Sequence, residues 1–579
     1  MTQLFIDNQT VVLQKNFSIQ LIEENPFFTR NGKTTLEVTL SLKNKTNAKI
    51  YKHCHRLNNS APIALNRSAR LIANNKVLLI GTEIILEISD TEVKIQLVAG
   101  ESEMNFLTSE RKINELDLGD ILDSKIEYIP IFSTSLDDII NKMYIYQPVN
   151  NAVSPYLAED LIVNVAYQPL LYHVINKIIK SFGYKEVSNV LETTDFKYLY
   201  FLNITNSSYY NKMLPDWTVS EFFEEIEKLF NVIFLVDEHS KRVDIRFKKD
   251  FYDSKRIIFI DKVLDNYTQK IDTENRTDYS VANIGYDVDS DDYFKFQNID
   301  PEILKHVDET IHFPDFNSIV SHFNAIPNKE SLKDKIFIAD NSNTQYICYL
   351  GEKLETEDYY PKKVNAFEPI RNNPNSTDID IELKIKPASM CVFDVPVYKE
   401  GTNSLSQPLY FLRTQMPIME SNPYDFINNY GSIDIQNIIE GESTIDQQKV
   451  SNMVIYFYKG KVTIYEPDME YAVGTRKVDF PMAFVDFLYE FNVLFDRKIN
   501  EDNLSLRLNY PEGFRTLYEQ SISIDTTKEY KFIFITNKKL NARSLFVFNN
   551  KKFACKEFRF TIDEVGINSV IEGLFYPVE

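Results

Sequence analysis

Residues 36–42, Leu-Glu-Val-Thr-Leu-Ser-Leu, alternate strictly between apolar and polar side chains. Successive side chains of a β-strand point to opposite faces, so four apolar residues would share one face: Leu36, Val38, Leu40 and Leu42. Four more strand-like runs follow, at 69–73, 76–80, 83–88 and 92–98. Turns are expected between them at Asn74-Asn75, Gly81-Thr82 and 89–91, because these residue types suit turn conformations. Residues 1–154 are therefore predicted to form a β-rich domain.

A compact α+β insertion is predicted at residues 155–265. Apolar residues recur at helical spacing from Pro169 to Phe182, and Gly183 suits the position just past the helix. A second helix should begin at Thr218, because Glu221 three residues later completes a capping-box pattern. Two strands, at 231–236 and 242–247, should follow it.

The remaining chain is divided into a middle region, 266–420, and a C-terminal domain, 421–579. The middle region is polar and irregular up to about residue 345, then strand-like again, for example at 379–385, with a loop at 371–376. The C-terminal domain is predicted to be β-rich, with strands at 530–535, 544–548 and 553–562 and a hairpin turn at Asn549-Asn550. Residues 484–495 fit either a helix or a buried strand. The predicted fold class is α+β and predominantly β, with several β-barrel- or sandwich-like domains.

Composition restricts the function. A chain of 579 residues is too long to fold around a single hydrophobic core. Its net charge is −21 and its pI is near 5.0, so its surface would repel a phosphate backbone. Specific nucleic-acid binding is therefore not expected. The first residues show neither the basic nor the apolar region of a signal peptide, and no apolar run approaches the roughly 20 residues of a membrane span. We expect synthesis in a reducing cytoplasm.

The most metal-like cluster is His53-Cys54-His55. In a strand, both imidazoles would share a face and could supply two ligands. No spacing pattern supplies two more ligands, and the flanking Lys52 and Arg56 disfavour a cation, so ordinary strand residues are expected. No CxxC pair exists, and small core residues are expected at all four cysteines: Cys54, Cys348, Cys391 and Cys555.

The acidic run from Asp287 to Asp292 could offer oxygen ligands to calcium. An EF-hand loop starting there needs Gly at its sixth position and Glu at its twelfth, and the chain has Asp292 and Asn298 instead. A solvated loop is therefore expected. Trp217, the only tryptophan, precedes the predicted capped helix and is expected to be a hydrophobic staple or core residue.

No enzyme motif is found among the nucleophile, metalloprotease and nucleotide-binding patterns. We therefore predict no enzyme, no cofactor, and no catalytic, cofactor-binding or metal-binding residues. The 34 Tyr and 41 Phe residues suit protein interfaces, although β-rich folds also favour aromatic residues.

Three segments resemble the tail-hub or baseplate-hub proteins of tailed bacteriophages, particularly those of Bacteroidetes phages and prophages. They are the N-terminal strands (36–42 and 93–100), parts of the insertion (167–171 and 214–223) and the C-terminal end (549–556 and 573–576). The resemblance implies a virion structural protein, commonly a trimer, whose β-barrel-like domains form a pseudo-hexameric ring. Such a ring joins the tail tube to spike, baseplate or fibre proteins. Three copies would carry a charge of about −63, and an acidic lumen would let DNA pass without binding.

Two other functions stay open on the residues alone. A carbohydrate- or host-surface-binding fibre or adhesin should show an exposed aromatic cluster in a cleft. A carboxylate-based glycosidase of unrecognised type should show two facing carboxylates in a deep pocket, with perturbed pKa values.

Overall fold

The computed structural model describes most of the chain, with gaps. The described residues are 1–59, 64, 66–121, 144–146, 165–203, 209–253, 256–264, 267–271, 282–287, 309–332, 335–340, 344–352, 357–363, 369–370, 372, 378–401, 407–418, 453–467, 475–485, 505–508, 514–519 and 522–578. The fold is predominantly β with several helices, which confirms the predicted class. No described helix has the length and apolarity that crossing a bilayer demands.

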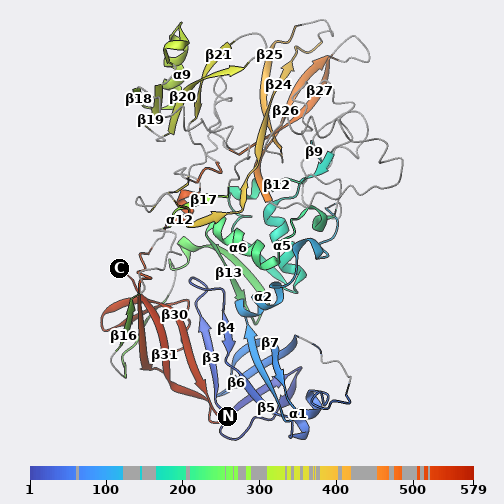
Figure 1. Cartoon of the computed structure of the whole chain (residues 1–579), viewed down its shortest axis with the longest axis vertical. Helices are drawn as coiled ribbons and strands as arrows, with labels where there is room; N and C mark the ends of the chain where they lie inside the picture. Colours follow the sequence, from blue (N-terminus) through green and yellow to red (C-terminus); the bar gives the residue numbers. More distant parts are fainter. Residues whose placement is uncertain are drawn as a thin grey trace.

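The N-terminal domain is a barrel of six strands around one core (Figure 1). The strands are β1 (Thr2–Ile6), β2 (Gln9–Val11), β5 (Val38–Ser41), β6 (Arg67–Ala73), β7 (Lys76–Ile88) and β8 (Glu92–Ala99). They pair antiparallel in the order β2-β1-β6-β7-β8-β5. A short helix, α1 (Lys45–Ile50), packs at the end of the barrel between β5 and β2.

Two details of this domain differ from the sequence prediction. Leu36 is 46% exposed and precedes β5, although Val38, Leu40 and Leu42 are buried as predicted. Residues 76–88 form one strand, so the turn predicted at Gly81-Thr82 is wrong. Gly81 instead lets β8 approach, because a Cβ there would lie 2.0 Å from the carbonyl oxygen of Val98. The turn at Asn74-Asn75 is confirmed, with φ of 50° and 57°.

The end of the chain forms a second barrel together with β15 (Ile257–Phe259) and β16 (Thr268–Ile271), which come from the predicted insertion and the predicted middle region. Its strands are β28 (Lys528–Ile535), β29 (Leu545–Phe548), β30 (Lys551–Ile562), β31 (Ile567–Pro577) and β15, with β16 paired to the start of β28. Leu264 N donates to Ile533 O at 2.8 Å, which joins the chain after β15 to β28 and closes the barrel. The predicted strands and the Asn549-Asn550 turn are confirmed. The core is mostly aromatic: Phe532, Phe534, Phe546, Phe548, Phe553, Phe558 and Phe575.

The two barrels belong to one continuous sheet of 14 strands. Strand β3 (Ile19–Glu24) pairs antiparallel with β30 on one side and with β4 (Lys33–Thr35) on the other. Strand β4 then pairs with β8. The first and last parts of the chain therefore lie side by side (Figure 1).

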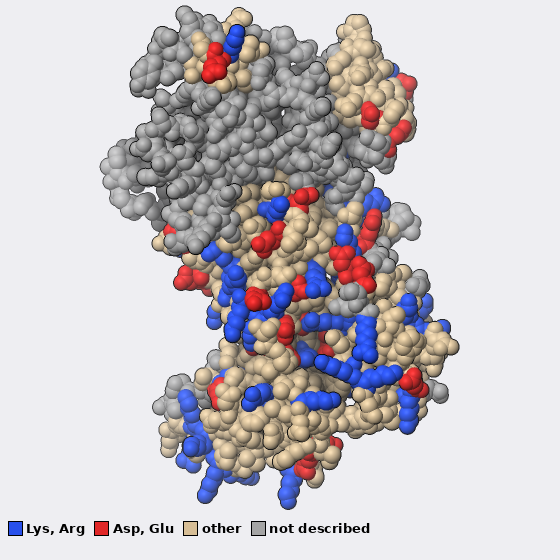
Figure 2. Space-filling model, turned by 180° about the vertical axis from the view of Figure 1, so that it is seen from behind, with Lys and Arg blue, Asp and Glu red and all other residues tan. Residues whose placement is uncertain are grey.

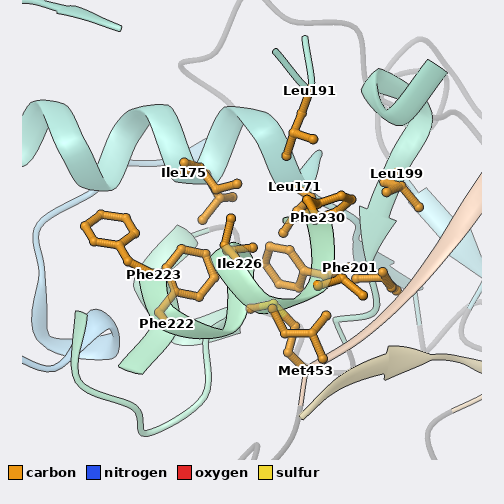
Figure 3. Close-up of a cluster of buried hydrophobic side chains, with 14 of the residues drawn as sticks. Leu171, Ile175, Leu191, Leu199, Phe201, Phe222, Phe223, Ile226, Phe230 and Met453 are labelled. Atoms are coloured by element: carbon orange, nitrogen blue, oxygen red, sulfur yellow. The ribbon is translucent and has the colours of Figure 1, made fainter. Parts of the chain in front are cut away.

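The insertion packs two helices against a three-stranded sheet. Helix α5 (Leu171–Ser181) and helix α6 (Val219–Phe230) confirm the two predicted helices, and Thr218 and Glu221 form the predicted capping box. The sheet has the order β11 (Glu186–Asn189), β14 (Arg242–Phe247), β13 (Val232–Asp237). Phe222, Phe223 and Phe230 of α6 meet Ile175 of α5 in the core (Figure 3). Helix α2 (Glu101–Thr108) leads from β8 into this unit.

The insertion also shares its core with later segments. Strand β12 (Leu199–Phe201) pairs with the long β26 (Met453–Pro467), which pairs with β27 (Thr475–Phe484) and β23 (Ile385–Pro387). Met453 therefore lies in the same cluster as Phe201 (Figure 3). Two short strands, β17 (Ile284–Tyr286) and β22 (Ile381–Leu383), pair beside them, and α12 (Arg515–Tyr518) adds Leu517 to the core.

The middle region is more regular than predicted. Residues 309–363 contain a four-stranded sheet with a helix, α9 (Phe316–Ala325), packed on it. Its strands are β18 (Glu309–Phe313), β19 (Lys335–Ala339), β20 (Thr344–Glu352) and β21 (Glu357–Lys363). Two further antiparallel pairs are present. Strand β24 (Ser389–Val397) pairs with β25 (Tyr410–Ile418), and β9 (Tyr144–Tyr146) pairs with β10 (Val165–Tyr167). Most of the loop at 371–376 and of the ambiguous segment 484–495 lies outside the described residues.

Candidate functional site

The candidate site is the junction where the two barrels and the insertion meet, and Asn25 lies at its centre. This residue follows β3, is fully buried, and donates its backbone N–H to Lys556 O at 2.8 Å. Its side-chain Nδ2 donates to Cys555 O at 2.7 Å and to the Tyr252 hydroxyl at 2.9 Å. One amide thus connects the N-terminal barrel, the C-terminal barrel and the end of the insertion.

Ion pairs surround the same junction. Arg543 Nη2 contacts Glu101 Oε1 at 2.5 Å, and that carboxylate also accepts the N–H of Val236 at 3.0 Å. Glu103 accepts from Thr82 at 2.8 Å and from Lys241 at 2.6 Å. Glu101 and Glu103 are 8% and 4% exposed, so these pairs are screened less by water than surface pairs are. The first turn of α2 therefore fixes the insertion against both barrels.

A cleft of about 810 Å³ opens beside the junction. Its wall is made by the loop after β3, by α6, by β22 and by the ends of β13 and β31. Five cations line it: Arg30, Lys228, Lys248, Lys384 and Lys556. Burial raises the pKa of the Glu227 carboxyl in this wall to about 7, although Arg30 lies 3.4 Å away and opposes the shift.

Four acids also line the cleft: Glu224 and Glu227 on α6, and Asp380 and Glu382 at or beside β22. Glu224 is held in an ion pair with Lys228 at 2.8 Å.

The His53-Cys54-His55 cluster does not lie in a strand, so that part of the prediction is wrong. The three residues follow α1 in a turn, where His53 has a φ of 56°. The two imidazole rings lie 6.0 Å apart between centroids. In the described part of the chain, no group of three or more His, Cys, Asp or Glu side chains is arranged to hold a metal ion.

The tryptophan, the four cysteines and the acidic run considered in the sequence analysis either pack in hydrophobic cores or lie partly outside the described residues. Trp217 packs against the core of the insertion, as predicted. Cys555 is fully buried, which confirms a core cysteine, whereas Cys54 is half-buried. The side chains of Cys348 and Cys391 lie outside the described residues, as does the acidic run beyond Asp287.

No protein-family model and no curated protein sequence matches the chain. Among solved structures, the chain is similar to the 43 kDa tail protein of prophage MuSo2 from Shewanella oneidensis, with 8% identity and a TM-score of 0.31 over 99% of this chain and 96% of that one. A tail protein from Neisseria meningitidis MC58 aligns with 6% identity and a TM-score of 0.29, over 99% and 95%. At these values, this chain's own geometry has to support any functional conclusion.

Proposed function

We propose that the chain is a structural subunit of a bacteriophage tail or baseplate, and that three copies form a ring-shaped hub. The hub would connect the tail tube to spike, baseplate or fibre proteins. The chain would act by assembling with other tail proteins in the virion and would carry out no catalysis.

The observation that carries this proposal is the pairing of β3 with β30. It places two barrels side by side in one chain, with Glu23 opposite Phe558 and Leu21 opposite Phe560. Three chains arranged around an axis would then present six barrels. A trimer built in this way can meet a six-fold symmetric tube, because each barrel can occupy one of six equivalent positions.

The rigidity of the junction supports the same role. A hub has to transmit force without letting its two barrels separate. The buried contacts of Asn25 and the Arg543–Glu101 pair connect the barrels to each other and to the insertion. The insertion is thereby held at a fixed angle to the sheet, where it can contact a neighbouring component.

The charge distribution suggests which part would line a passage for DNA. Residues 1–121, 165–271 and 522–579 contain 38 Lys and Arg against 36 Asp and Glu, a net charge of +2. The remaining residues, 122–164 and 272–521, contain 25 against 48, a net charge of −23. The acidic charge of the chain is therefore carried outside the barrels and the insertion, and an acidic lumen would need these segments to face it.

The native mass of the purified chain tests this proposal. One chain has a mass of 67.7 kDa, so light scattering after size exclusion should give about 203 kDa for a trimer. A monomer that persists at high protein concentration and in the presence of the purified tail tube would contradict the ring. A stable dimer would also contradict it, because two chains supply only four barrels.

A further inference from the structure

One long stretch of this acidic chain contains no acidic residue. From Val38 to Thr82 there are 45 residues with neither Asp nor Glu, eight Lys or Arg and two His. At the average density of 84 acids in 579 residues, such a stretch would hold about six. Without this stretch, the rest of the chain has a net charge of −29, so the local charge is opposite to that of its surroundings.

The fold gathers five of these cations at one end of the N-terminal barrel, which we name the basic tip: Lys43, Lys45, Lys49, Lys52 and Arg56. All five side chains are exposed: Lys45 and Lys49 lie on α1, Lys43 precedes it, and Lys52 and Arg56 lie in the turns that follow it. Figure 1 places α1 at the end of the molecule opposite the middle region, and Figure 2 shows Lys and Arg side chains protruding from that lower end.

The platform beneath the basic tip is rigid. The inner side of α1 is buried through Asn47, Ala48 and Ile50. The next residue, Tyr51, is fully buried and donates its hydroxyl to Glu83. Glu83 also accepts from Arg67 Nε at 2.8 Å. A surface partner would therefore meet cations whose backbone is already ordered, so little conformational entropy would be lost there on binding.

The cations of the basic tip repel one another. Lys45 and Lys49 stand four residues apart on α1, a spacing at which like charges destabilise a helix. Among the described residues, no ion pair compensates Lys43, Lys45 or Lys49, although the acids Asp90 and Glu92 lie on the neighbouring strand end, where Glu92 stands opposite Ser41. A bound partner with negative charge would remove this repulsion.

We propose that the basic tip is a docking surface for an acidic protein partner. Leu57 follows Arg56 and is fully exposed, which supplies the apolar anchor typical of protein interfaces. The only Tyr, Phe or Trp of the acid-free stretch is the buried Tyr51, and the rings of His53 and His55 are half-buried, so the stretch has no exposed stacking platform for nucleic-acid bases. Helix α1 has six residues, and the exposed Leu57 lies after it, so the basic tip lacks the broad apolar face of a membrane-binding helix. This inference stands whether or not the chain forms a ring.

Binding of a labelled random copolymer of Glu and Tyr to the full chain tests this inference, with poly-Glu, a 20-base-pair DNA duplex and phosphatidylglycerol vesicles as competing probes. The charge-reversed variant Lys43→Glu/Lys45→Glu/Lys49→Glu should bind the copolymer at least tenfold more weakly than the parent chain. A matched variant of three exposed lysines on the C-terminal barrel, Lys262→Glu/Lys270→Glu/Lys539→Glu, has the same change in net charge and should bind within twofold of the parent.

The single variant Leu57→Ser separates the apolar anchor from the charge. It should lose the preference for the Glu–Tyr copolymer over poly-Glu while keeping the affinity for poly-Glu. Equal binding of the copolymer by both triple variants would overturn the proposal. Tighter binding of the DNA duplex or of the vesicles than of the copolymer, at matched charge concentration, would overturn the assignment to a protein partner.

Discussion

The side-chain amide of Asn47 pairs with the backbone of Val12 in the way a neighbouring strand would. Asn47 Oδ1 accepts the Val12 N–H at 2.9 Å, and Nδ2 donates to Val12 O at 2.9 Å. The same Nδ2 donates to Ser41 O at 3.0 Å. Val12 follows β2 and Ser41 ends β5, so this one buried side chain closes the N-terminal barrel where the two strands do not pair directly.

Replacing Asn47 with Ala should destabilise the N-terminal barrel by about 3 kcal/mol. The substitution leaves the N–H and C=O of Val12 and the C=O of Ser41, all part-buried, without the Asn47 side chain, and each lost partner costs about 1 kcal/mol. Urea unfolding followed by circular dichroism measures the change. Ala at the exposed Lys49 of the same helix is the control and should change stability by less than about 0.5 kcal/mol. Equal stability of the two variants would contradict the closing role of Asn47.

Gly81→Ala should cost about 3 kcal/mol or more. The new Cβ would lie 2.0 Å from Val98 O, so β7 and β8 would have to separate. Gly183→Ala is the comparison, because Gly183 has a φ of 87° but open space around the Cβ position. It should cost only about 1 kcal/mol, through backbone strain. Similar melting temperatures for both variants would show that β7 and β8 do not approach closely at Gly81.

The Arg543–Glu101 pair should couple the C-terminal barrel to α2. A double-mutant cycle with Arg543→Ala and Glu101→Ala is expected to give a coupling energy of about 1–3 kcal/mol, because Glu101 is largely buried and also accepts from Val236. The exposed Lys538–Asp261 pair at 3.2 Å is the control and should couple by less than about 1 kcal/mol. Equal coupling energies for the two pairs would contradict the conclusion that the Arg543–Glu101 pair holds the C-terminal barrel against α2.

Glu227 should make stability depend on pH. Burial raises the pKa of this acid in the folded chain to about 7, so the fold favours its protonated form. The contribution of Glu227 to the free energy of unfolding is fully present below the pKa that this carboxyl has in the unfolded chain. It is lost as the pH rises through about 7, the pKa in the folded chain. Glu227→Gln should therefore stabilise the protein at pH 8 relative to the parent, and the difference should shrink toward pH 5 in thermal unfolding.

Glu221 on the same helix provides a control of opposite sign. Its hydrogen bonds from Thr218 lower the pKa of its carboxyl, so its contribution is present near neutral pH and is lost as the pH falls through the folded pKa. Glu221→Gln should destabilise at pH 8 and have little effect in strong acid. The same pH trend in both variants would contradict the opposite pKa shifts of Glu227, which burial raises, and Glu221, which hydrogen bonds lower.

Local structure could be predicted well from the sequence wherever a physical signal is short-range. The capping box at Thr218, the apolar spacing of α5 and α6 and the paired asparagines of two hairpin turns all act within a few residues. They were confirmed for that reason. The turn at Gly81 was predicted wrongly because a glycine can serve either a turn or a close approach of two strands, and only the partner strand decides between them.

The junction could not be predicted, because its contacts join residues hundreds of positions apart. Asn25 reads as an ordinary polar residue before Pro26, and nothing near it in sequence indicates Cys555 or Tyr252. The pairing of β3 with β30 likewise leaves no local pattern, since both strands would suit many partners. The division of the chain into four segments stays a prediction. Residues 19–24 and 551–562 pair in one sheet, so the two ends of the chain are joined in the fold.

The most direct test of the central claim is electron microscopy of the purified chain viewed along the ring axis, alone and bound to the tail tube. The account predicts six similar densities around a central opening, contributed alternately by the N-terminal and C-terminal barrels, with three-fold symmetry in the averaged images. Particles with three densities, or with the two barrels of one chain at different heights along the axis, would contradict the proposal that the paired barrels form a pseudo-hexameric ring.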